Sequence, residues 1–298
     1  MAKIPLDYII DMPQKISQLL HDGIARLQKA GVSESELSAR LLLQHVLKKK
    51  RIQLQLAYSE IADDNAIEEY YKLIDKRCNH YPVQYIVGEV EFYNIKLKVN
   101  EHVLIPRPET EELIEYLLNI IKERSYLRIL DIGAGSGNIA ISLAANLNDA
   151  IITSIDISND ALIVAKDNAK TNQVSPKIKF IQADCLSDDF WSSIGRFDVI
   201  VSNPPYVDKT DYEALQPEVK LYEPKTALVP GDDPFVFYET IARHAESSLN
   251  SQGIVCFEIG FGQAEQIENI IRNALPSASL EIINDLSGIP RIVIGRLC

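Results

Sequence analysis

Asp131-Ile132-Gly133-Ala134-Gly135-Ser136-Gly137 is the stretch of sequence that decides the fold. The residues from Arg128 to Asp131 predict a short buried strand before it, and residues 138–146 predict a helix directly after it. Glycine lets the backbone approach a ligand closely, and a helix N-terminus offers N–H groups to it. In isolation such a turn can hold a dinucleotide, a nucleoside or nothing. The spacing lacks the third glycine of the dinucleotide fingerprint, because Asn138 follows.

Strand-like and helix-like segments alternate on the C-terminal side of this turn. The expected strands after the first are 150–156, 178–183, 197–202, 253–258, 280–285 and 291–294, and the expected helices are 138–146, 158–172, 235–249 and 262–274. Such alternation predicts an α/β fold with a parallel, doubly wound sheet. Ligands of this kind of sheet bind at the carboxyl ends of the strands.

Polar residues end or follow four successive strands of the predicted sheet, namely Asp131, Asp156, Asp184 and Asn203. The carboxylate of Asp156 can accept hydrogen bonds from both hydroxyls of a ribose. Asp184, with Cys185 beside it, is placed to bind the amino group of an adenine. One acid at a strand end is usually a turn former or a helix cap, but four such residues in succession are hard to explain in that way. We therefore expect them to share one ligand site.

The stretch Asn203-Pro204-Pro205-Tyr206 predicts a site for a planar amino group. The side-chain carbonyl of Asn203 can accept a hydrogen bond, and Pro205 keeps Pro204 out of the helical region, so that backbone carbonyls stay available. Tyr206 supplies a flat face. These residues suit a –C(=O)–NH2 group or a ring –NH2 group. An ordinary strand-to-loop turn is the alternative, and the glycine turn upstream favours the functional interpretation.

The N-terminal part of the chain, residues 14–80, is predicted to be a small helical bundle without a catalytic motif. Gly31 ends a first helix, and Ser33 with Glu36 indicates a capping box that opens a second. The basic run 48–51 is interpreted as a solvated helix end, with a partner contact as the alternative. Residues 65–79 predict a further helix.

Two further elements are predicted between the bundle and the glycine turn. After Pro82, residues 88–93 and 95–99 predict a β-hairpin. In segment 105–112 the prolines hold the chain extended, and Thr110 starts a helix that runs to Ile121. This segment is either a plain helix entry or a cover over a ligand.

Composition narrows the class of protein further. The chain has 298 residues, 46% hydrophobic and 24% charged, which is typical of a globular protein of one large or two ordinary domains. Its four cysteines form no Cys-x-x-Cys pair, which argues against a disulfide framework or a zinc site. No apolar run reaches the ~18 residues of a spanning helix, and residues 1–7 lack a signal-peptide core. We expect a cytoplasmic protein. The sequence holds no P-loop, no Gly-x-Ser-x-Gly elbow and no metal-ligand spacing among its histidines.

The glycine turn 133–137 with Asp156 resembles the S-adenosylmethionine site of class I methyltransferases. The stretch 203–206 resembles the branch that methylates adenine or glutamine amino groups. Further motifs narrow the resemblance, namely Tyr-Ile-Val-Gly-Glu-Val-Glu-Phe-Tyr at 85–93, Val-Leu-Ile-Pro-Arg-Pro-Glu-Thr-Glu at 103–111, Glu-Ile-Gly at 258–260 and Gly-Ile-Pro-Arg at 288–291. Over nearly its whole length the chain is similar to the HemK/PrmC family of peptide-chain release factor glutamine N5-methyltransferases.

This resemblance implies a class I methyltransferase fold, with a doubly wound seven-stranded sheet and a small N-terminal helical bundle. Its expected domains are a substrate-docking domain at 1–82, a β-hairpin linker at 83–107 and a methyltransferase domain at 108–298. The implied cofactor is S-adenosylmethionine, bound by 133–137, Asp156, Asp184, Cys185 and Asn203. The implied substrate is the glutamine of the Gly-Gly-Gln loop in class 1 release factors, held by 203–206. We expect no metal, no nucleic acid, no membrane and a monomer.

The chain departs from the family pattern at two places. Gly-Asp-Asp-Pro at 231–234 replaces a Gly-Asp-Gly-type turn, which leaves the geometry of that turn open. Cys185 stands where an aromatic residue often stacks on adenine, and Trp191 is a candidate to take over that role.

Two other functions fit parts of the pattern. An adenine-N6 methyltransferase acting on DNA or RNA needs the same acceptor pair, but it should also carry a basic binding region. Residues 1–84 carry 12 Lys+Arg against 11 Asp+Glu, whereas residues 85–298 carry 18 against 31. Such an acidic catalytic half fits poorly with a phosphate backbone, although a local patch can oppose the average. A non-catalytic binding protein is the third candidate, and the intact 203–206 stretch argues against it.

Overall fold

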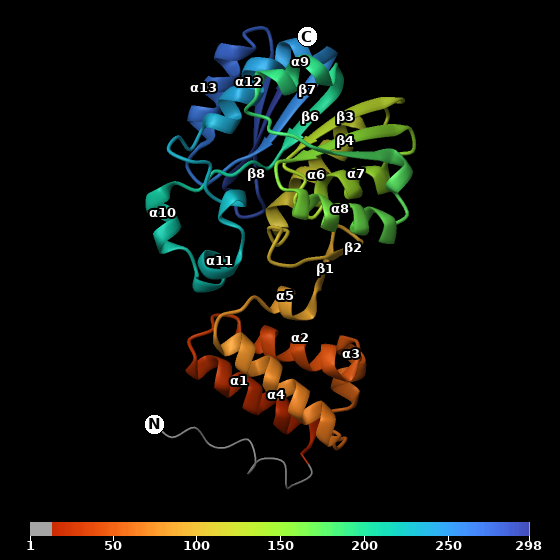
Figure 1. Cartoon of the computed structure of the whole chain (residues 1–298), viewed down its shortest axis with the longest axis vertical. Helices are drawn as coiled ribbons and strands as arrows, with labels where there is room; N and C mark the ends of the chain where they lie inside the picture. The colour runs from red at the N-terminus through yellow and green to blue at the C-terminus, as the bar shows by residue number, and fades with distance from the viewer. Residues whose placement is uncertain (1–13, 298) are drawn as a thin grey trace. The chain divides into compact units, whose positions relative to one another are not determined.

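The computed structural model describes residues 14–297 and divides them into two compact units. The first unit holds the described residues up to Gly88 together with Pro217–Tyr222. The second holds Glu89–Gln216 and the residues from Glu223 onward. Figure 1 shows that the first unit is helical and that the second is built around a twisted sheet. The expectation about residues 1–7 lies outside the described part of the chain.

The first unit confirms the predicted helical region. Its helices are α1 (Ile16–Lys29), α2 (Ser35–Leu47), α3 (Arg51–Leu56), α4 (Asp64–Cys78) and α5 (Val83–Val87). Their apolar faces meet in one core that includes Leu19 and Leu42. The helices α1 and α4 approach closely at Gly23, where an added Cβ would lie 2.1 Å from the hydroxyl of Tyr70. That hydroxyl donates to the carbonyl oxygen of Ala39 at 3.3 Å, which ties α4 to α2.

One local prediction in this unit is wrong. The helix α2 begins at Ser35 with Glu34 as its N-cap and no capping bond from that side chain, so Ser33 does not open a capping box. The basic run 48–51 lies at the exposed end of α2, as predicted, and its last residue also begins the next helix. Lys48 adopts the left-handed conformation that ends α2, and Arg51 begins α3. A helix usually stops in this way at glycine, and here lysine takes that position.

A helix from far along the chain belongs to the first unit. In α11 (Pro217–Tyr222), Glu218 accepts a 2.8 Å hydrogen bond from the guanidinium of Arg77 in α4. The hydroxyl of Tyr222 donates to the carbonyl oxygen of Asn79 at 2.8 Å, and its ring centroid lies 4.9 Å from that of Tyr81. Local sequence patterns do not indicate this packing, because Arg77 and Glu218 are 141 positions apart.

The second unit is built on a seven-stranded sheet with the strand order β5-β4-β3-β6-β7-β9-β8. The strands are β3 (Leu127–Ile132), β4 (Ala150–Asp156), β5 (Ile178–Gln182), β6 (Phe197–Ser202), β7 (Leu249–Glu258), β8 (Ser279–Asn284) and β9 (Pro290–Arg296). The doubly wound α/β architecture is confirmed. The expectation of a fully parallel sheet is wrong at β9, which runs antiparallel to β7 and β8. The connection between β8 and β9 is only residues 285–289, and a parallel crossover needs about a dozen.

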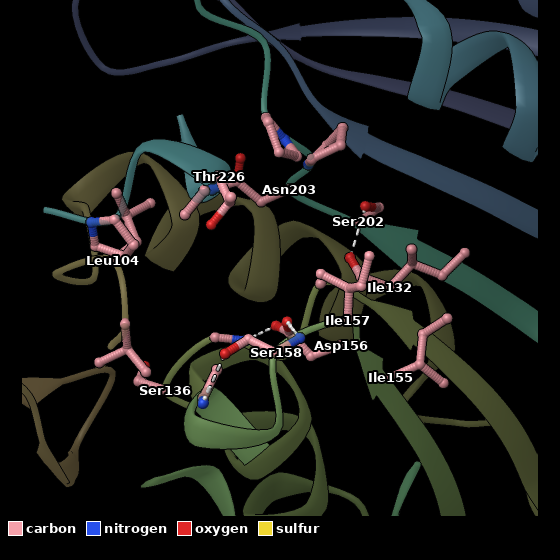
Figure 2. Close-up of a pocket in the computed structure, with 18 of the residues that line it drawn as sticks. Leu104, Ile132, Ser136, Ile155, Asp156, Ile157, Ser158, Ser202, Asn203 and Thr226 are labelled. Atoms are coloured by element: carbon pink, nitrogen blue, oxygen red, sulfur yellow. Dashed lines mark hydrogen bonds between the residues drawn. The ribbon is translucent and has the colours of Figure 1, made fainter. Parts of the chain in front are cut away.

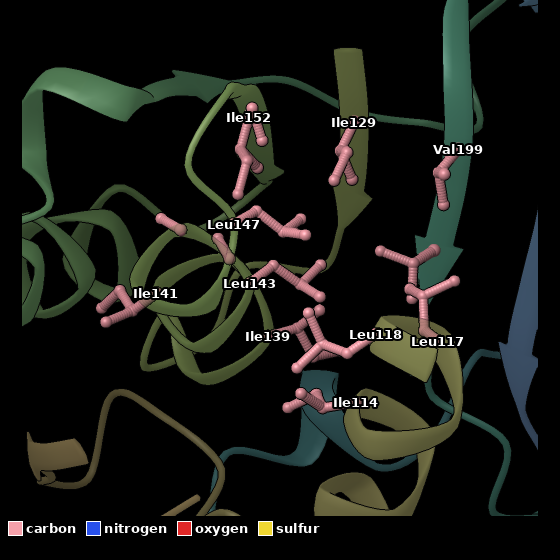
Figure 3. Packing of buried hydrophobic residues seen from close by; sticks show 14 of the residues in the cluster. Ile114, Leu117, Leu118, Ile129, Ile139, Ile141, Leu143, Leu147, Ile152 and Val199 are labelled. Carbon is pink, nitrogen blue, oxygen red and sulfur yellow. The ribbon is translucent and has the colours of Figure 1, made fainter. Parts of the chain in front are cut away.

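Helices cover both faces of this sheet. On one face α6 (Pro108–Ile121), α7 (Asn138–Asn146) and α8 (Asn159–Thr171) pack on the strands, and Figure 3 shows Ile114, Leu117 and Leu143 gathered against Ile129 and Val199. On the other face lie α9 (Asp188–Ile194), α12 (Val236–Ser248) and α13 (Ala264–Ala274). The remaining elements are α10 (Lys209–Ala214) and the 3-10 turns Ser175–Lys177 and Lys225–Ala227. With both faces buried, the carboxyl edge of the strands is left for a site.

The predicted β-hairpin is present as β1 (Glu89–Phe92) and β2 (Ile95–Lys98), and it packs into the core of the second unit. Asn168 of α8 bonds β2 in the manner of a neighbouring strand. Its Oδ1 accepts from the backbone N–H of Lys98 at 2.7 Å, and its Nδ2 donates to the carbonyl oxygen of Lys98 at 3.0 Å. No helix within residues 14–297 is long and apolar enough to cross a membrane.

Candidate active site

A pocket opens at the carboxyl ends of β3, β4 and β6 in the second unit, and Figure 2 shows the side chains around it. Nine of the residues predicted for the site line this pocket, namely Gly133, Gly135, Ser136, Asp156, Asp184, Cys185, Asn203, Pro204 and Pro205. The segment that precedes α6 also lines it, through residues such as Leu104 and Arg107. Ala134, Gly137 and Tyr206 are not among the lining residues.

The glycine turn has a backbone that other residues rarely adopt. The φ angles of Gly133, Gly135 and Gly137 are 88°, 51° and 83°. At Gly137 an added Cβ would also lie 2.8 Å from Cδ1 of Ile141. Gly137 donates to the carbonyl oxygen of Ala134 at 2.7 Å, and Ala134 donates to that of Ile155 at 2.8 Å. Ala134 and Gly137 therefore shape the turn rather than line the pocket.

The carboxylate of Asp156 fixes the turn from the end of β4. Its Oδ2 accepts from the backbone N–H of Gly135 at 2.9 Å, and its Oδ1 accepts from that of Ser158 at 2.8 Å. Burial raises the pKa of Asp156, and these hydrogen bonds oppose the rise. A carboxylate has about four lone-pair sites, so both oxygens can still accept from a ligand.

Asp131 does not belong to the pocket wall. It is fully buried, and its Oδ2 accepts from the hydroxyl of Ser154 at 2.7 Å. Burial raises the pKa of Asp131 to about 7, with a further rise from the charge of Asp156. Of the four strand-end residues, three line the pocket, and Asp131 lies inside the sheet.

The far end of the pocket is formed by Asp184 and Cys185. Oδ1 of Asp184 accepts from the backbone N–H of Leu186 at 2.9 Å. Burial raises the pKa of the Cys185 thiol to about 12, so it stays a neutral apolar group. Trp191 is not a pocket residue, since its indole N–H donates to the carbonyl oxygen of Cys185 at 2.7 Å and its ring stacks on His244. Trp191 therefore positions the Cys185 backbone and presents no face to the pocket.

Asn203 is held from two directions. The first contact is made by Ser202, the residue before it. The hydroxyl of Ser202 donates to the carbonyl oxygen of Ile132 at 2.7 Å, and this hydrogen bond joins the ends of β6 and β3 (Figure 2). The Nδ2 of Asn203 donates to the hydroxyl of Thr110 at 3.2 Å. Thr110 in turn donates to Oε2 of Glu258 at 2.6 Å. Since Nδ2 and Oδ1 diverge from one carbon, Oδ1 points away from Thr110 and stays available as an acceptor.

Tyr206 closes the stretch 203–206 from behind. Its carbonyl oxygen accepts from Nε2 of Gln263 at 3.0 Å. Its ring lies against Gly260, where an added Cβ would be 2.9 Å from Cδ2 of Tyr206. Burial raises the pKa of the phenol to about 12. The aromatic face predicted for a substrate is thus placed beside Gly260, outside the pocket wall.

Four residues of this region were not predicted as site residues, namely Arg107, Thr110, Glu223 and Glu258. Besides Thr110 and Glu258, a buried carboxylate at Glu223 accepts from Arg107 at 2.6 Å and from the backbone N–H of Ile105 at 3.0 Å. It fixes the extended segment that lines the pocket, which supports the interpretation of 105–112 as a cover. The turn 231–234 is also ordered, since Asp233 accepts from the backbone N–H of Phe235 just before α12.

The strand order, the antiparallel β9, the glycine turn after β3 and the acid at the end of β4 define a class I methyltransferase fold. The same fold is seen in the hMettl16 catalytic domain, solved in complex with MAT2A 3′UTR hairpin 6. That structure is 18% identical, with a TM-score of 0.54 over 68% of this chain and 76% of its own. Residues 112–231 match the methyltransferase small domain family, and residues 18–88 match the PrmC N-terminal domain family.

Two relatives match nearly the whole chain. The release factor glutamine methyltransferase of Chlorobaculum tepidum is 39% identical over 282 residues, which cover 93% of this chain and 95% of the relative. That of Bacillus anthracis is 38% identical over 275 residues, which cover 91% and 95%. The chain therefore belongs to the release factor glutamine methyltransferase family, as the motifs predict.

Proposed function

We propose that this chain transfers a methyl group from S-adenosylmethionine to the side-chain amide nitrogen of the glutamine in the Gly-Gly-Gln loop of class 1 release factors. Family membership supports the reaction and the substrate. The observation that carries the proposal is that Asn203, Pro204 and Pro205 line the same pocket as the glycine turn and Asp156. In this proposal, a nucleoside-binding end and an amide-binding end lie in one cavity.

The pocket residues fit S-adenosylmethionine. The backbone of the glycine turn allows close approach of the methionine part, and Asp156 can accept from the ribose hydroxyls. Near Asp184, Ile157 and Leu186 line the pocket as exposed apolar side chains and offer faces for the adenine. They take the place of the aromatic residue that is missing at Cys185. When bound, this cofactor supplies a methyl group on a positively charged sulfur.

The acceptor residues make the amide nitrogen reactive by orienting it. An amide nitrogen is a weak nucleophile because its lone pair is delocalised into the carbonyl. Oδ1 of Asn203 and the backbone carbonyl of Pro204 accept the two N–H groups and aim the nitrogen at the methyl group. Positive charge grows on the nitrogen as the N–C bond forms and the S–C bond breaks, so both acceptors bind the transition state more strongly than the ground state. Positioning alone can lower the barrier by ~7 kcal/mol. The extra proton leaves the nitrogen after the transfer.

The test is incubation with methyl-labelled S-adenosylmethionine and either a class 1 release factor or duplex DNA. We expect label on the release factor, and its loss when the glutamine of the Gly-Gly-Gln loop is replaced. Label on adenine instead would establish the competing adenine-N6 activity. Cofactor binding without label on either substrate would establish a binding protein.

The helical first unit is proposed to dock the substrate. Residues 14–82 supply no lining residue of the pocket, and a folded release factor needs more contact than one loop gives. In this proposal residues 1–82 are the docking domain, 83–107 the linker and 108–298 the methyltransferase domain, and the chain works as a monomer in the cytoplasm. Removing residues 1–80 should spare cofactor binding and sharply reduce methylation of intact release factor. Full activity of the truncated chain would refute the docking role.

A further inference from the structure

Three side chains from three elements form one chain of hydrogen bonds beside the pocket. Asn203 follows β6, Thr110 lies in the first turn of α6, and Glu258 ends β7. Nδ2 of Asn203 lies 3.2 Å from Oγ1 of Thr110, and that oxygen lies 2.6 Å from Oε2 of Glu258. Thr110 and Asn203 both line the pocket and Glu258 does not, but Thr110 and Glu258 are buried whereas Asn203 is partly exposed. Of the three, Asn203 therefore has the most side-chain surface open to a substrate amide.

The charge of Glu258 determines which group donates and which accepts in each of these hydrogen bonds. An ionised carboxylate only accepts, so Thr110 must donate its one hydroxyl hydrogen to Glu258. The hydroxyl oxygen of Thr110 then only accepts, and Asn203 must turn its Nδ2 toward it. Oδ1 of Asn203 is thereby directed to the other side, where an incoming amide N–H needs an acceptor.

We propose that Thr110 and Glu258 are positioning residues that select which end of the Asn203 amide faces the substrate. This inference rests on the proposed function, because the selection matters only for an acceptor of amide N–H groups. Without the Thr110 hydroxyl the side chain of Asn203 keeps only its hydrogen bond to Glu258, so it can rotate by 180° about its last bond more readily. Its Nδ2 would then meet the substrate N–H as donor against donor, and the nitrogen would lose one of its two acceptors.

When Glu258 is protonated, the donors and acceptors in these hydrogen bonds can exchange roles. A protonated Glu258 can donate to Thr110, which can then donate to Oδ1 of Asn203. Burial raises the pKa of Glu258 to about 7, so the reversal falls within an accessible pH range. The charged and titratable groups that face Glu258 from the packed elements are Glu109 of α6, Arg291 of β9, Cys256 of β7, Tyr238 of α12 and Tyr206. Glu109 raises the pKa of Glu258, and Arg291 lowers it.

The test compares Thr110→Val with Thr110→Ser in the full-length chain. Valine keeps the shape of threonine and removes the hydroxyl, whereas serine keeps the hydroxyl. We expect Thr110→Val to lower the single-turnover rate of release factor methylation by about 10- to 100-fold, less than removal of Asn203 itself, and Thr110→Ser to stay near the wild-type rate. Affinity for S-adenosylmethionine should stay within about twofold in both. Thr240→Val is the matched control, since Thr240 is also buried in the second unit and does not line the pocket.

The pH dependence of the methylation rate distinguishes this positioning role from a purely structural role, which would leave the pH profile unchanged. The wild-type rate should fall on the acid side with a midpoint near the raised pKa of Glu258, and Glu258→Gln should lack this acid limb. A normal rate in Thr110→Val, or an equal loss in Thr110→Ser, would overturn the positioning role while wild-type methylation still supports the proposed function. A wild-type chain that does not methylate the release factor would overturn both.

Discussion

Nδ2 of Asn168 donates a 2.9 Å hydrogen bond to the carbonyl oxygen of Ser136, inside the glycine turn. The same buried carboxamide pairs with both backbone groups of Lys98 in β2. One side chain of α8 therefore holds the hairpin and the ligand-binding turn at the same time. Neither role is visible in the sequence, where Asn168 is one polar residue in a helix.

This relationship predicts that Asn168→Ala weakens cofactor binding without a change at the pocket wall. The loss of one hydrogen bond that orders the turn should cost about 1 kcal/mol, or roughly a fivefold rise in the dissociation constant for S-adenosylmethionine in calorimetry. Asn172→Ala is the matched control. Asn172 lies one turn further along the chain and bonds Lys96 of the same strand, without a bond to the glycine turn. Equal weakening in both variants would show that the hairpin, and not the turn, is responsible.

Asp156→Ala should weaken cofactor binding more than Asn168→Ala does. The variant loses the acceptors for the ribose hydroxyls, at ~1.5–3 kcal/mol for each hydrogen bond to a charged group. It also frees the backbone N–H groups of Gly135 and Ser158, which the carboxylate now orders. Calorimetry with S-adenosylmethionine and with free adenosine separates the two effects, since the ribose is common to both ligands. Unchanged affinity for both would place the ribose elsewhere.

The elements of the second unit could be predicted because each is set by its own local pattern. The expected bounds of α7, β4 and β6 agree with the structure, since an apolar run ends at a polar residue or a glycine in each case. The short helices α9, α10 and α11 were not predicted, because six or seven residues carry too little periodicity. The antiparallel β9 could not be seen from strand pattern alone, since only the length of its connection decides it.

The site was predicted where it is made of strand ends and missed where it is made of distant partners. Asp156 and Asn203 follow strands directly, so the fold rule for strand ends finds them. Thr110 and Glu258 are 148 positions apart, and their shared role exists only after α6 and β7 have packed. The candidate Trp191 shows the opposite limit, since an aromatic residue near the site in sequence is turned to His244 in the structure.

Glu258 also predicts a pH dependence of stability. Burial raises its pKa from 4.5 to about 7 in the folded chain, so the folded state keeps this proton after the unfolded state has lost it. The stabilising contribution is therefore full below about pH 4.5 and is lost as the pH rises toward about 7. Glu258→Gln removes this dependence. As the pH rises across that range, the unfolding free energy of the wild type should fall relative to that of Glu258→Gln. Above that range the difference between the two should stay constant. Chemical denaturation at several pH values checks this, and a difference that is flat from pH 4.5 to 7 would contradict it.

The ion pair between Arg77 and Glu218 predicts a stability effect confined to the first unit. The Arg77 side chain is 3% exposed, so Glu218→Ala leaves an unpaired buried charge, at a cost on the order of 3 kcal/mol. The double variant Arg77→Met with Glu218→Leu should recover most of that loss, because no buried charge remains. Hydrogen exchange of α4 reports the first unit. The single tryptophan, Trp191, lies in the second unit, so its fluorescence transition should stay in place and serves as the internal control. A shift in that transition would contradict the confinement.

The sharpest prediction concerns Asn203 itself. Asn203→Ala removes one acceptor and leaves both prolines and β6 in place, so the single-turnover methylation rate should fall by a factor on the order of 10² to 10³. Affinity for S-adenosylmethionine should change little. Asn203→Asp would keep more activity than Ala if acceptance alone mattered. The Thr110 hydroxyl, however, has one hydrogen and would face two carboxylates, the one introduced at position 203 and that of Glu258.

We therefore expect Asn203→Asp to be as slow as Asn203→Ala near neutral pH, because repulsion between the two carboxylates turns the new side chain away from the position of the amide. Adding Glu258→Gln to the Asn203→Asp variant removes one of the two charges and should recover part of the rate. Such a rescue is expected only if residues 203, 110 and 258 act as one unit. A near-normal rate in Asn203→Ala would reduce the stretch 203–206 to a structural turn. A fast Asn203→Asp variant with no response to Glu258→Gln would show that acceptance at position 203 does not depend on the buried partners.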